Sequence, residues 1–308
     1  MLQVVLKQTV VPFLFVLSFM VSPCTFAATL ESNSAINTIE RIHTLGGIEQ
    51  GYYDQSLFLN NLKMALEATK EDFGAYQLTH ETLPMEQRRE FKSLATGKLD
   101  IIWSMTSKPR EQVGIAIRTP LAYGIYGYRL LLTNTQDSII TDQRAPLESL
   151  KSKVAVQGPT WPDTEILRYN GFNVQTTSWS NNMFMLLARD YFDYFPRSVF
   201  EIDDELTTLA EDNITLHVEP DFALYYPTAF FFFVTPNKPA LAARLRAGLR
   251  RISENGSRRA FFDEYIEKRH SIRSLKQKEI IQLENPLLSD ETLQALSQPE
   301  NTIHFDNE

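Results

Sequence analysis

The sequence has little of what secreted domains use to cross-link themselves or to bind zinc. Its one cysteine, Cys24, allows no disulfide within a single chain and no cysteine-rich zinc site. Its five histidines lie far apart, and none falls in an HExxH or HxxxH spacing. The sequence therefore predicts a protein that works without a metal site and without a cofactor.

The chain also has no excess of basic residues over acidic ones. The chain has 30 Lys and Arg residues against 38 Asp and Glu residues, which gives a net charge of −8. An acidic chain with dispersed bases is a poor candidate for binding nucleic acid, because binding requires a basic patch that neutralises phosphates. The sequence also contains no GxSxG elbow and no phosphate loop, which argues against an α/β-hydrolase and against a nucleotide-hydrolysing enzyme.

The balance of residues that are present is that of an ordinary folded protein. Hydrophobic residues make up 43% of the chain and charged residues 22%. A length of 308 residues fits one large domain or two lobes of ordinary size.

Residues 1–27 have the three-part pattern of a secretory signal peptide. Lys7 and the amino terminus supply positive charge, residues 9–22 are almost wholly apolar, and the segment TFA at residues 25–27 has small residues at its first and third positions. The apolar run is shorter than the roughly 20 residues of a membrane span, and Pro23 is a poor lipobox residue before Cys24. We therefore expect cleavage near Ala27 and a periplasmic protein, rather than an uncleaved anchor or a lipoprotein.

Strand patterns and helix patterns alternate along the rest of the chain. The pattern predicts strands at residues 36–42, 76–80, 99–103, 128–133, 153–157, 172–177, 193–195 and 228–235. It predicts helices at residues 146–151, 183–189, 198–212 and 239–252. Further helices are expected around Phe58–Leu66, after Pro84 and after Gly256, and one more is expected to be capped by Thr160. Such alternation is typical of mostly parallel sheets flanked by helices. The polar residues 283–308 are predicted to form a surface tail.

Four segments of the chain resemble periplasmic solute-binding proteins of the type II fold, in the family 3 group that contains the amino-acid binders of ABC transporters. They are GKLDIIW at 97–103 followed by SKPR at 107–110, PL at 120–121 with GYRL at 127–130, KVAVQG at 153–158, and YP at 226–227 with FFFFV at 230–234. These segments occur in the family's order and span most of the chain after residue 27. The segments WPD at 161–163 and DYFPR at 193–197 make it similar to a divergent branch.

The resemblance implies an α/β chain with two lobes, each a mostly parallel sheet flanked by helices, joined by two hinge strands. The first lobe would consist of residues 28–130 and 226–308, and the second of residues 131–225. The implied function is capture of a small solute, amino-acid-like or an organic acid, for an ABC-type transporter or a membrane sensor. A monomer that binds no nucleic acid is expected.

In the first lobe, the resemblance assigns the ligand's carboxylate to Arg110. A forked guanidinium suits this role because it donates two parallel hydrogen bonds. The alternative is a surface salt bridge with the adjacent Glu111. Thr106, Ser107, Trp103 and Tyr53 complete the expected contacts on this side.

In the second lobe, the resemblance places the ligand at the start of a helix, near Thr160, Trp161 and Asp163. Backbone N–H groups at a helix start attract anions. However, Pro159 and Pro162 each remove one donor, and Asp163 adds negative charge. Trp161 either forms a wall of the cleft or packs in the core.

The chain departs from the amino-acid binders at two positions. Met105 stands where they carry a hydroxyl residue. Ser198, beside Arg197, stands where they carry the acid that holds the ligand's ammonium group, and a buried ammonium needs such an anion. We therefore predict a second anionic contact at Arg197 and Ser198. Alternatively, Arg197 forms a structural bridge with Glu201, or Glu201 serves as a displaced acid.

Two other functions are compatible with the same fold. A secreted dehydratase-like enzyme would need a general acid or base in the cleft, and the candidates are Asp163, Asp193 and Glu201. A ligand-sensing partner of a membrane receptor would need a separate signalling protein. The sequence favours a protein that is not an enzyme.

Overall fold

The computed structural model describes residues 39–46, 56–81, 85–177 and 182–303. The predicted signal peptide, Tyr53 and Pro84 lie outside these described residues. No helix in the described ranges is long and apolar enough to cross a bilayer.

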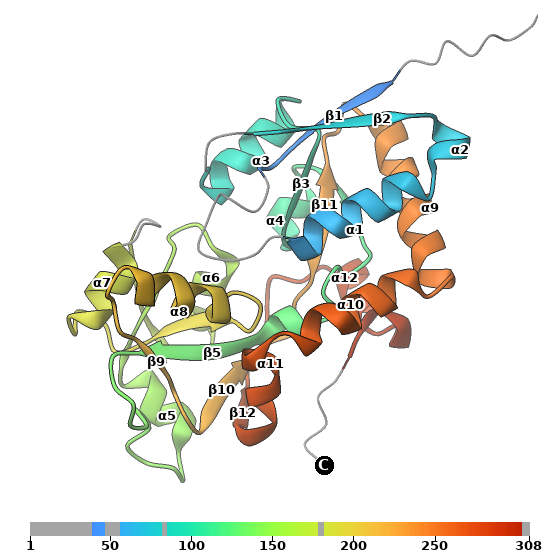
Figure 1. Cartoon of the computed structure of the whole chain (residues 1–308). Coiled ribbons are helices and arrows are strands. Elements are labelled where there is room, and N and C mark those ends of the chain that lie inside the picture. The colour runs from blue at the N-terminus through green and yellow to red at the C-terminus, as the bar shows by residue number, and fades with distance from the viewer. Residues whose placement is uncertain (1–38, 47–55, 82–84, 178–181, 304–308) are drawn as a thin grey trace, which may run out of the picture. The chain divides into compact units, whose positions relative to one another are not determined.

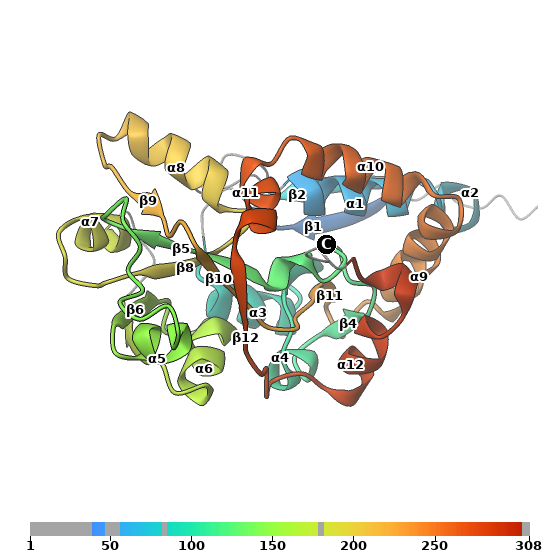
Figure 2. The same ribbon diagram turned by 90° about the horizontal axis from the view of Figure 1, so that it is seen from below.

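The first sheet has five strands in the order β2-β1-β3-β11-β4. β1, β2 and β3 run parallel, whereas β11 is antiparallel to both of its neighbours, β3 and β4. Helices cover both faces of this sheet, with α1 and α10 on one side and α4 and α12 on the other (Figures 1 and 2). Its strands are β1 (Glu40–Thr44), β2 (Tyr76–His80), β3 (Ile101–Met105), β4 (Ile115–Ile117) and β11 (Phe230–Val234). The helices nearby are α1 (Ser56–Glu67), α2 (Lys70–Phe73), α3 (Gln87–Ala95), α4 (Lys108–Glu111), α9 (Pro239–Glu254), α10 (Ser257–Glu267) and α12 (Asp290–Leu296).

The second group of strands centres on β5, which pairs with β8, β9 and β10. A parallel pair, β6 and β7, reaches this group through a bridge between Ala155 and Tyr194. α8 lies on one side of these strands, and α5 and α6 lie on the other (Figure 2). The strands are β5 (Tyr128–Thr133), β6 (Val154–Gln157), β7 (Asn173–Thr176), β8 (Phe195–Ser198), β9 (His217–Val218), β10 (Phe222–Tyr225) and β12 (Glu279–Gln282). The helices are α5 (Pro146–Lys151), α6 (Pro162–Tyr169), α7 (Asn182–Ala188), α8 (Ile202–Glu211) and α11 (His270–Ser274).

These elements confirm the predicted α/β fold but correct three details of it. The sheets are mixed rather than mostly parallel, because β5, β8, β10 and β11 each pair antiparallel. Residues 195–198 form strand β8, so the helix expected from residue 198 begins at Ile202 instead. Thr160 is not the cap of α6, whose N-cap is Trp161, with Pro162 at the first-turn position that proline tolerates.

The core of the first sheet is built on the four consecutive phenylalanines of β11. Phe230 to Phe233 are at most 6% exposed and lie between β3 and β4. Phe230 stacks on Phe58 of α1 with ring centroids 4.8 Å apart, and Phe233 meets Phe91 of α3 edge-on at 5.1 Å. A continuous apolar run of this kind predicts a central strand buried on both faces, and the structure confirms that prediction.

The C-terminal segment is not a surface tail, contrary to the expectation from its polar sequence. β12 pairs in parallel with β10, and Leu283 and Leu288 are buried. Ser289 caps α12, and Glu111 accepts hydrogen bonds from both Ser289 and Thr292. Ser289 and Thr292 therefore anchor this segment to α4.

Candidate functional site

Strand β3, helix α4 and the turn between them carry four of the five residues predicted for the first lobe. Thr106 and Ser107 are 0% and 5% exposed, and the Thr106 hydroxyl donates to Glu111 at 2.7 Å. Trp103 lies in the core, 4% exposed, with its ring 6.2 Å from that of Phe58. Arg110 lines a pocket between α3 and α4.

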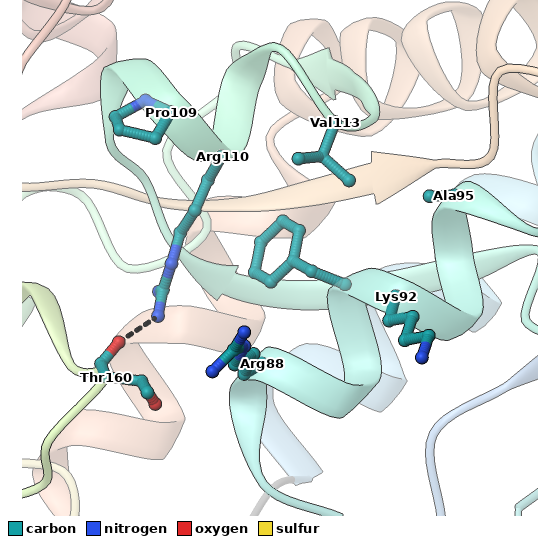
Figure 3. Close-up of a pocket in the computed structure, with 8 residues that line it drawn as sticks. Arg88, Lys92, Ala95, Pro109, Arg110, Val113 and Thr160 are labelled. Carbon is teal, nitrogen blue, oxygen red and sulfur yellow. Dashed lines mark hydrogen bonds between the residues drawn. The ribbon is translucent and has the colours of Figure 1, made fainter.

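The guanidinium group of Arg110 is half-buried and is held by neutral acceptors. Nη1 donates to Ser104 Oγ at 3.0 Å and to the Met105 carbonyl oxygen at 2.8 Å. Nη2 donates to Gln87 Oε1 at 2.5 Å and to the Thr160 carbonyl oxygen at 3.2 Å (Figure 3). Within the described ranges no carboxylate forms an ion pair with it. Arg110 therefore keeps an uncompensated positive charge at a fixed position.

The alternative pairing of Arg110 with Glu111 does not occur. Glu111 instead accepts hydrogen bonds from Arg118 at 2.7 Å and from three hydroxyl groups, two of them on the C-terminal segment. Burial lowers the pKa of Arg110 to about 10, although Glu90, Asp163 and Glu165 act in the opposite direction. The group thus stays charged at neutral pH, while its desolvation makes pairing with an added anion favourable.

Arg197 has a different environment, because two glutamates surround it. Its Nε and Nη2 donate to Glu205 at 2.5–3.0 Å, and Nη2 lies 3.0 Å from Glu201 Oε2. Burial lowers the pKa of Arg197, but the two carboxylates outweigh that effect and raise it overall. This geometry is the structural bridge that the sequence offered as an alternative, extended by Glu205.

The aromatic and hydroxyl residues near Arg197 are packed around it. The guanidinium carbon lies 5.3 Å from the ring of Trp161 and 4.9 Å from that of Phe195. Trp161 stacks on Phe195 with the ring planes 17° apart and closes over Gly158, where any Cβ would meet the indole at 2.5 Å. Ser198 is fully buried, and its backbone N–H donates to Glu201.

Asp163 is likewise bound by other residues of the chain. It forms an ion pair with Arg129 of β5 at 2.9 Å and accepts a hydrogen bond from the hydroxyl of Tyr226. Tyr226 in turn accepts from Arg129 Nε at 2.7 Å. The side chains of Arg129 and Tyr226 are 2% and 0% exposed. This closed triad commits the carboxylate of Asp163 to Arg129 and Tyr226.

Arg129 and Tyr226 are residues that the sequence argument did not single out. Arg129 is the one charged residue in the apolar strand YRLLLT, all of which is buried. A buried arginine needs a carboxylate partner, so its position in that strand was a usable signal. The partner itself, 34 residues away in sequence, could not be named from the pattern.

The pocket beside Arg110 has a volume of about 450 Å³ and lies between α3, α4 and residue 160 (Figure 3). It is lined by Arg88, Phe91, Lys92, Ala95, Pro109, Arg110, Val113 and Thr160. The structure thus brings Arg110 and Thr160 together, whereas Arg197, Ser198, Trp161 and Asp163 do not line this pocket. Within the described ranges, no group of three or more His, Cys, Asp or Glu side chains could hold a metal ion.

Comparison with known proteins gives matches to solved structures alone. No family model and no curated protein matches the chain. A periplasmic binding protein of Salmonella typhimurium, described for its arginine specificity, superposes with a TM-score of 0.54 at 14% identity over 75% of this chain and 99% of its own. A protein from Listeria monocytogenes assigned as an L-cystine ABC transporter gives 0.51 at 17% identity over 75% and 97%. The VFT2 domain of BvgS from Bordetella pertussis gives a TM-score of 0.53 at 14% identity over 73% of this chain and 92% of its own.

The mixed sheets flanked by helices, together with these matches, show that the chain has the two-lobed type II fold of the periplasmic binding proteins.

Proposed function

We propose that the protein is an extracytoplasmic solute-binding protein that captures a small anionic solute between two lobes. The observation that carries this proposal is Arg110, a half-buried cation whose four hydrogen-bond acceptors are all neutral. An anion that reaches this group gains a charge-assisted interaction without having to displace a carboxylate of the chain. A solute of amino-acid or organic-acid type fits that requirement.

The two lobes would be residues 28–130 with 226–308, and residues 131–225, with β5 and β10 as the hinge strands. Arg110 and the Thr160 carbonyl belong to different lobes in this division, and they are joined by a hydrogen bond. A ligand bound beside that contact would favour lobe closure, and a closed form is what a transporter distinguishes. Similar chains serve as periplasmic binding proteins and in ABC transport, which supports a periplasmic location and an ABC-type transporter as partner.

Catalysis is the less favoured use of this site. A dehydratase-like enzyme would need an available general acid or base, and each of the three candidates is occupied. Asp163 is paired with Arg129, Glu201 with Arg197, and Asp193 accepts the backbone N–H of Val154 at 2.6 Å. A binding protein needs no such group, and the similar structures include a periplasmic binding protein and a protein assigned to an ABC transporter.

Sensing is the alternative that the sequence leaves open, with the protein acting as the ligand-binding partner of a membrane receptor. A sensor would use the same pocket but present its closed form to a membrane receptor rather than to a permease. Pull-down with solubilised inner membrane, with and without ligand, separates the two, because recovery of a permease indicates transport and recovery of a kinase or cyclase indicates sensing.

Isothermal titration of the ligand-stripped protein against a panel of amino acids and organic acids tests the proposal. Arg110→Met should reduce affinity for the bound acid by about a hundredfold, the equivalent of one lost charge-assisted pair. Arg259→Met, an exposed arginine paired with Asp263 on α10, is the matched control and should bind like the wild type. Equal affinity in the Arg110 and Arg259 variants would refute the role of Arg110.

A further inference from the structure

The pocket between α3 and α4 combines an apolar wall with basic side chains, one of which is Arg110. We propose that it takes the apolar body of an organic carboxylate that lacks an α-amino group, while the carboxylate pairs with Arg110. This inference rests on the proposed function and names the class of solute for that site.

The wall of the pocket is almost entirely apolar. Phe91, Ala95, Pro109 and Val113 line it, and Thr160 is its one uncharged polar residue. The carbonyl oxygen of Thr160 already accepts a hydrogen bond from Arg110. A hydroxyl or amide on the body of the solute would lose its water against the apolar wall, where only the Thr160 side chain is an uncharged polar partner, and this costs binding energy. A hydrocarbon or aryl body meets no such penalty.

The charged side chains around the pocket are all basic. Arg88 and Lys92 lie on α3 and are exposed, and Arg110 extends from α4 towards Thr160 (Figure 3). Among the residues that the structure places, none of the three forms an ion pair with a carboxylate. The guanidinium carbon of Arg110 also lies 5.0 Å from the ring of Phe91, so the cation and the apolar wall adjoin each other. A carboxylate attached directly to an apolar group matches both surfaces at once.

No acidic residue lines the pocket, which bears on the ammonium group of amino acids. The carboxylates that act on Arg110 at longer range are Glu90, Asp163 and Glu165, and all three are outside the lining. Asp163 is also committed to Arg129 and Tyr226. The charged residues of the lining are therefore all basic around an α-ammonium group next to the bound carboxylate, and the Coulomb repulsion disfavours it. Met105 and Ser198, the two positions at which the sequence differs from the amino-acid binders, are consistent with a solute that has no ammonium group.

Four probes that differ by one property each test the inference. Phenylacetate has the carboxylate and the apolar body, phenylalanine adds the ammonium, phenylacetamide removes the charge, and succinate replaces the apolar body by a second carboxylate. Isothermal titration should show the tightest binding for phenylacetate, and at least about tenfold weaker binding for each of the other three.

Two variants connect the binding to the pocket. Val113→Gln places a polar amide in the apolar wall and should weaken phenylacetate by about tenfold. Arg88→Ala with Lys92→Ala should weaken it less and should also flatten its salt dependence, because exposed charges act through a screened field. Arg259→Ala with Lys268→Ala removes two exposed cations of α10 and is the matched control. Thermal unfolding of each variant confirms that it is folded.

The outcomes separate this inference from the proposed function. If phenylalanine or another amino acid binds through Arg110 and phenylacetate does not, the solute class is wrong and the binding function stands. Phenylacetate binding that is unaffected by Val113→Gln in a folded variant would likewise overturn the assignment to this pocket. If neither the probes nor the wider panel of acids bind to the wild type, both proposals fail.

Discussion

Arg110 and Arg197 are two arginines of the same predicted site, and the structure gives them opposite environments. Arg197 is 4% exposed and is enclosed by Glu201 and Glu205, so its charge is compensated within the chain. Arg110 is half-buried and bonded to neutral acceptors alone. An arginine with two carboxylate partners contributes to structure, whereas one held in place by neutral groups is prepared to meet an external anion. Residue type at a family position does not distinguish these cases.

The largest expected effect is on the stability of the Arg197 cluster. Arg197→Met would leave Glu201 and Glu205 buried without a cation, and removal of one partner from a buried ion pair costs about 3–5 kcal/mol. Arg110→Met breaks hydrogen bonds to neutral groups and should cost about 1–3 kcal/mol. Urea unfolding of both variants measures the difference.

A compensated variant provides the control for that comparison. Arg197→Met combined with Glu201→Gln and Glu205→Gln removes all three charges and should recover most of the lost stability, because no uncompensated buried charge remains. Equal losses of unfolding free energy in the Arg197 and Arg110 single variants would contradict the proposed difference, in which Arg197 is part of a buried ion-pair cluster and Arg110 is not.

The triad of Arg129, Asp163 and Tyr226 extends the comparison to the start of α6. Tyr226→Phe keeps the ring and the ion pair but removes a hydroxyl that bonds to both charged partners. A hydrogen bond to a charged group is worth about 1.5–3 kcal/mol in net terms. Because Arg129 and Asp163 still pair with each other after the hydroxyl is removed, we expect a total loss of about 1.5–3 kcal/mol. Tyr225→Phe on the adjacent residue is the control. A Tyr226→Phe variant as stable as this control would show that the hydroxyl adds nothing to the ion pair.

The smallest expected effect concerns Glu90, which is half-buried near Arg110. Burial raises the pKa of Glu90 from 4.5 to about 8, and Arg110 opposes the shift. The folded protein then holds this proton more tightly than the unfolded chain does. The resulting stabilisation is complete below about pH 4.5 and is lost as the pH rises through about 8, and solvent access to Glu90 keeps the slope well below the limit of about 1.4 kcal/mol per pH unit that one proton sets.

Glu90→Gln isolates that effect. The free energy of unfolding of the wild type should decline relative to the variant between pH 5 and pH 8, and solvent screening of the half-exposed carboxyl makes the slope above an upper limit. Parallel pH profiles for the two proteins would contradict a raised pKa at Glu90.

Much of the secondary structure could be predicted because its signals are local. The strand at 76–80, the strand at 128–133 and the helix at 146–151 have the boundaries that the sequence predicted. Errors arose where polar residues had distant partners. The polar sequence after residue 282 predicts a surface tail. In the structure, Ser289 and Thr292 of this segment donate hydrogen bonds to Glu111, about 180 residues earlier in the chain.

The candidate site was predictable in part. The resemblance placed Arg110 and Thr160 at one site, and the structure joins them across 50 positions of sequence. It did not find Gln87, which holds the same guanidinium, or the apolar wall of α3 with Arg88 and Lys92. These residues share no motif, and they meet because α3 and α4 pack beside each other. The roles predicted for Tyr53 and for the segment 1–27 concern residues outside the described ranges and stay predictions.

The sequence by itself determined the order of strands and helices, the fold class and the buried central strand, because hydrophobic periodicity and turn residues act within a few positions. The tertiary structure alone decided which charges are compensated. Arg129 bonds to Tyr226 across 97 positions, and Arg197 to Glu205 across eight, while Arg110 receives no carboxylate at all from the described residues. Ion pairing depends on distance and burial in space, and neither can be read from the spacing of residues along the chain.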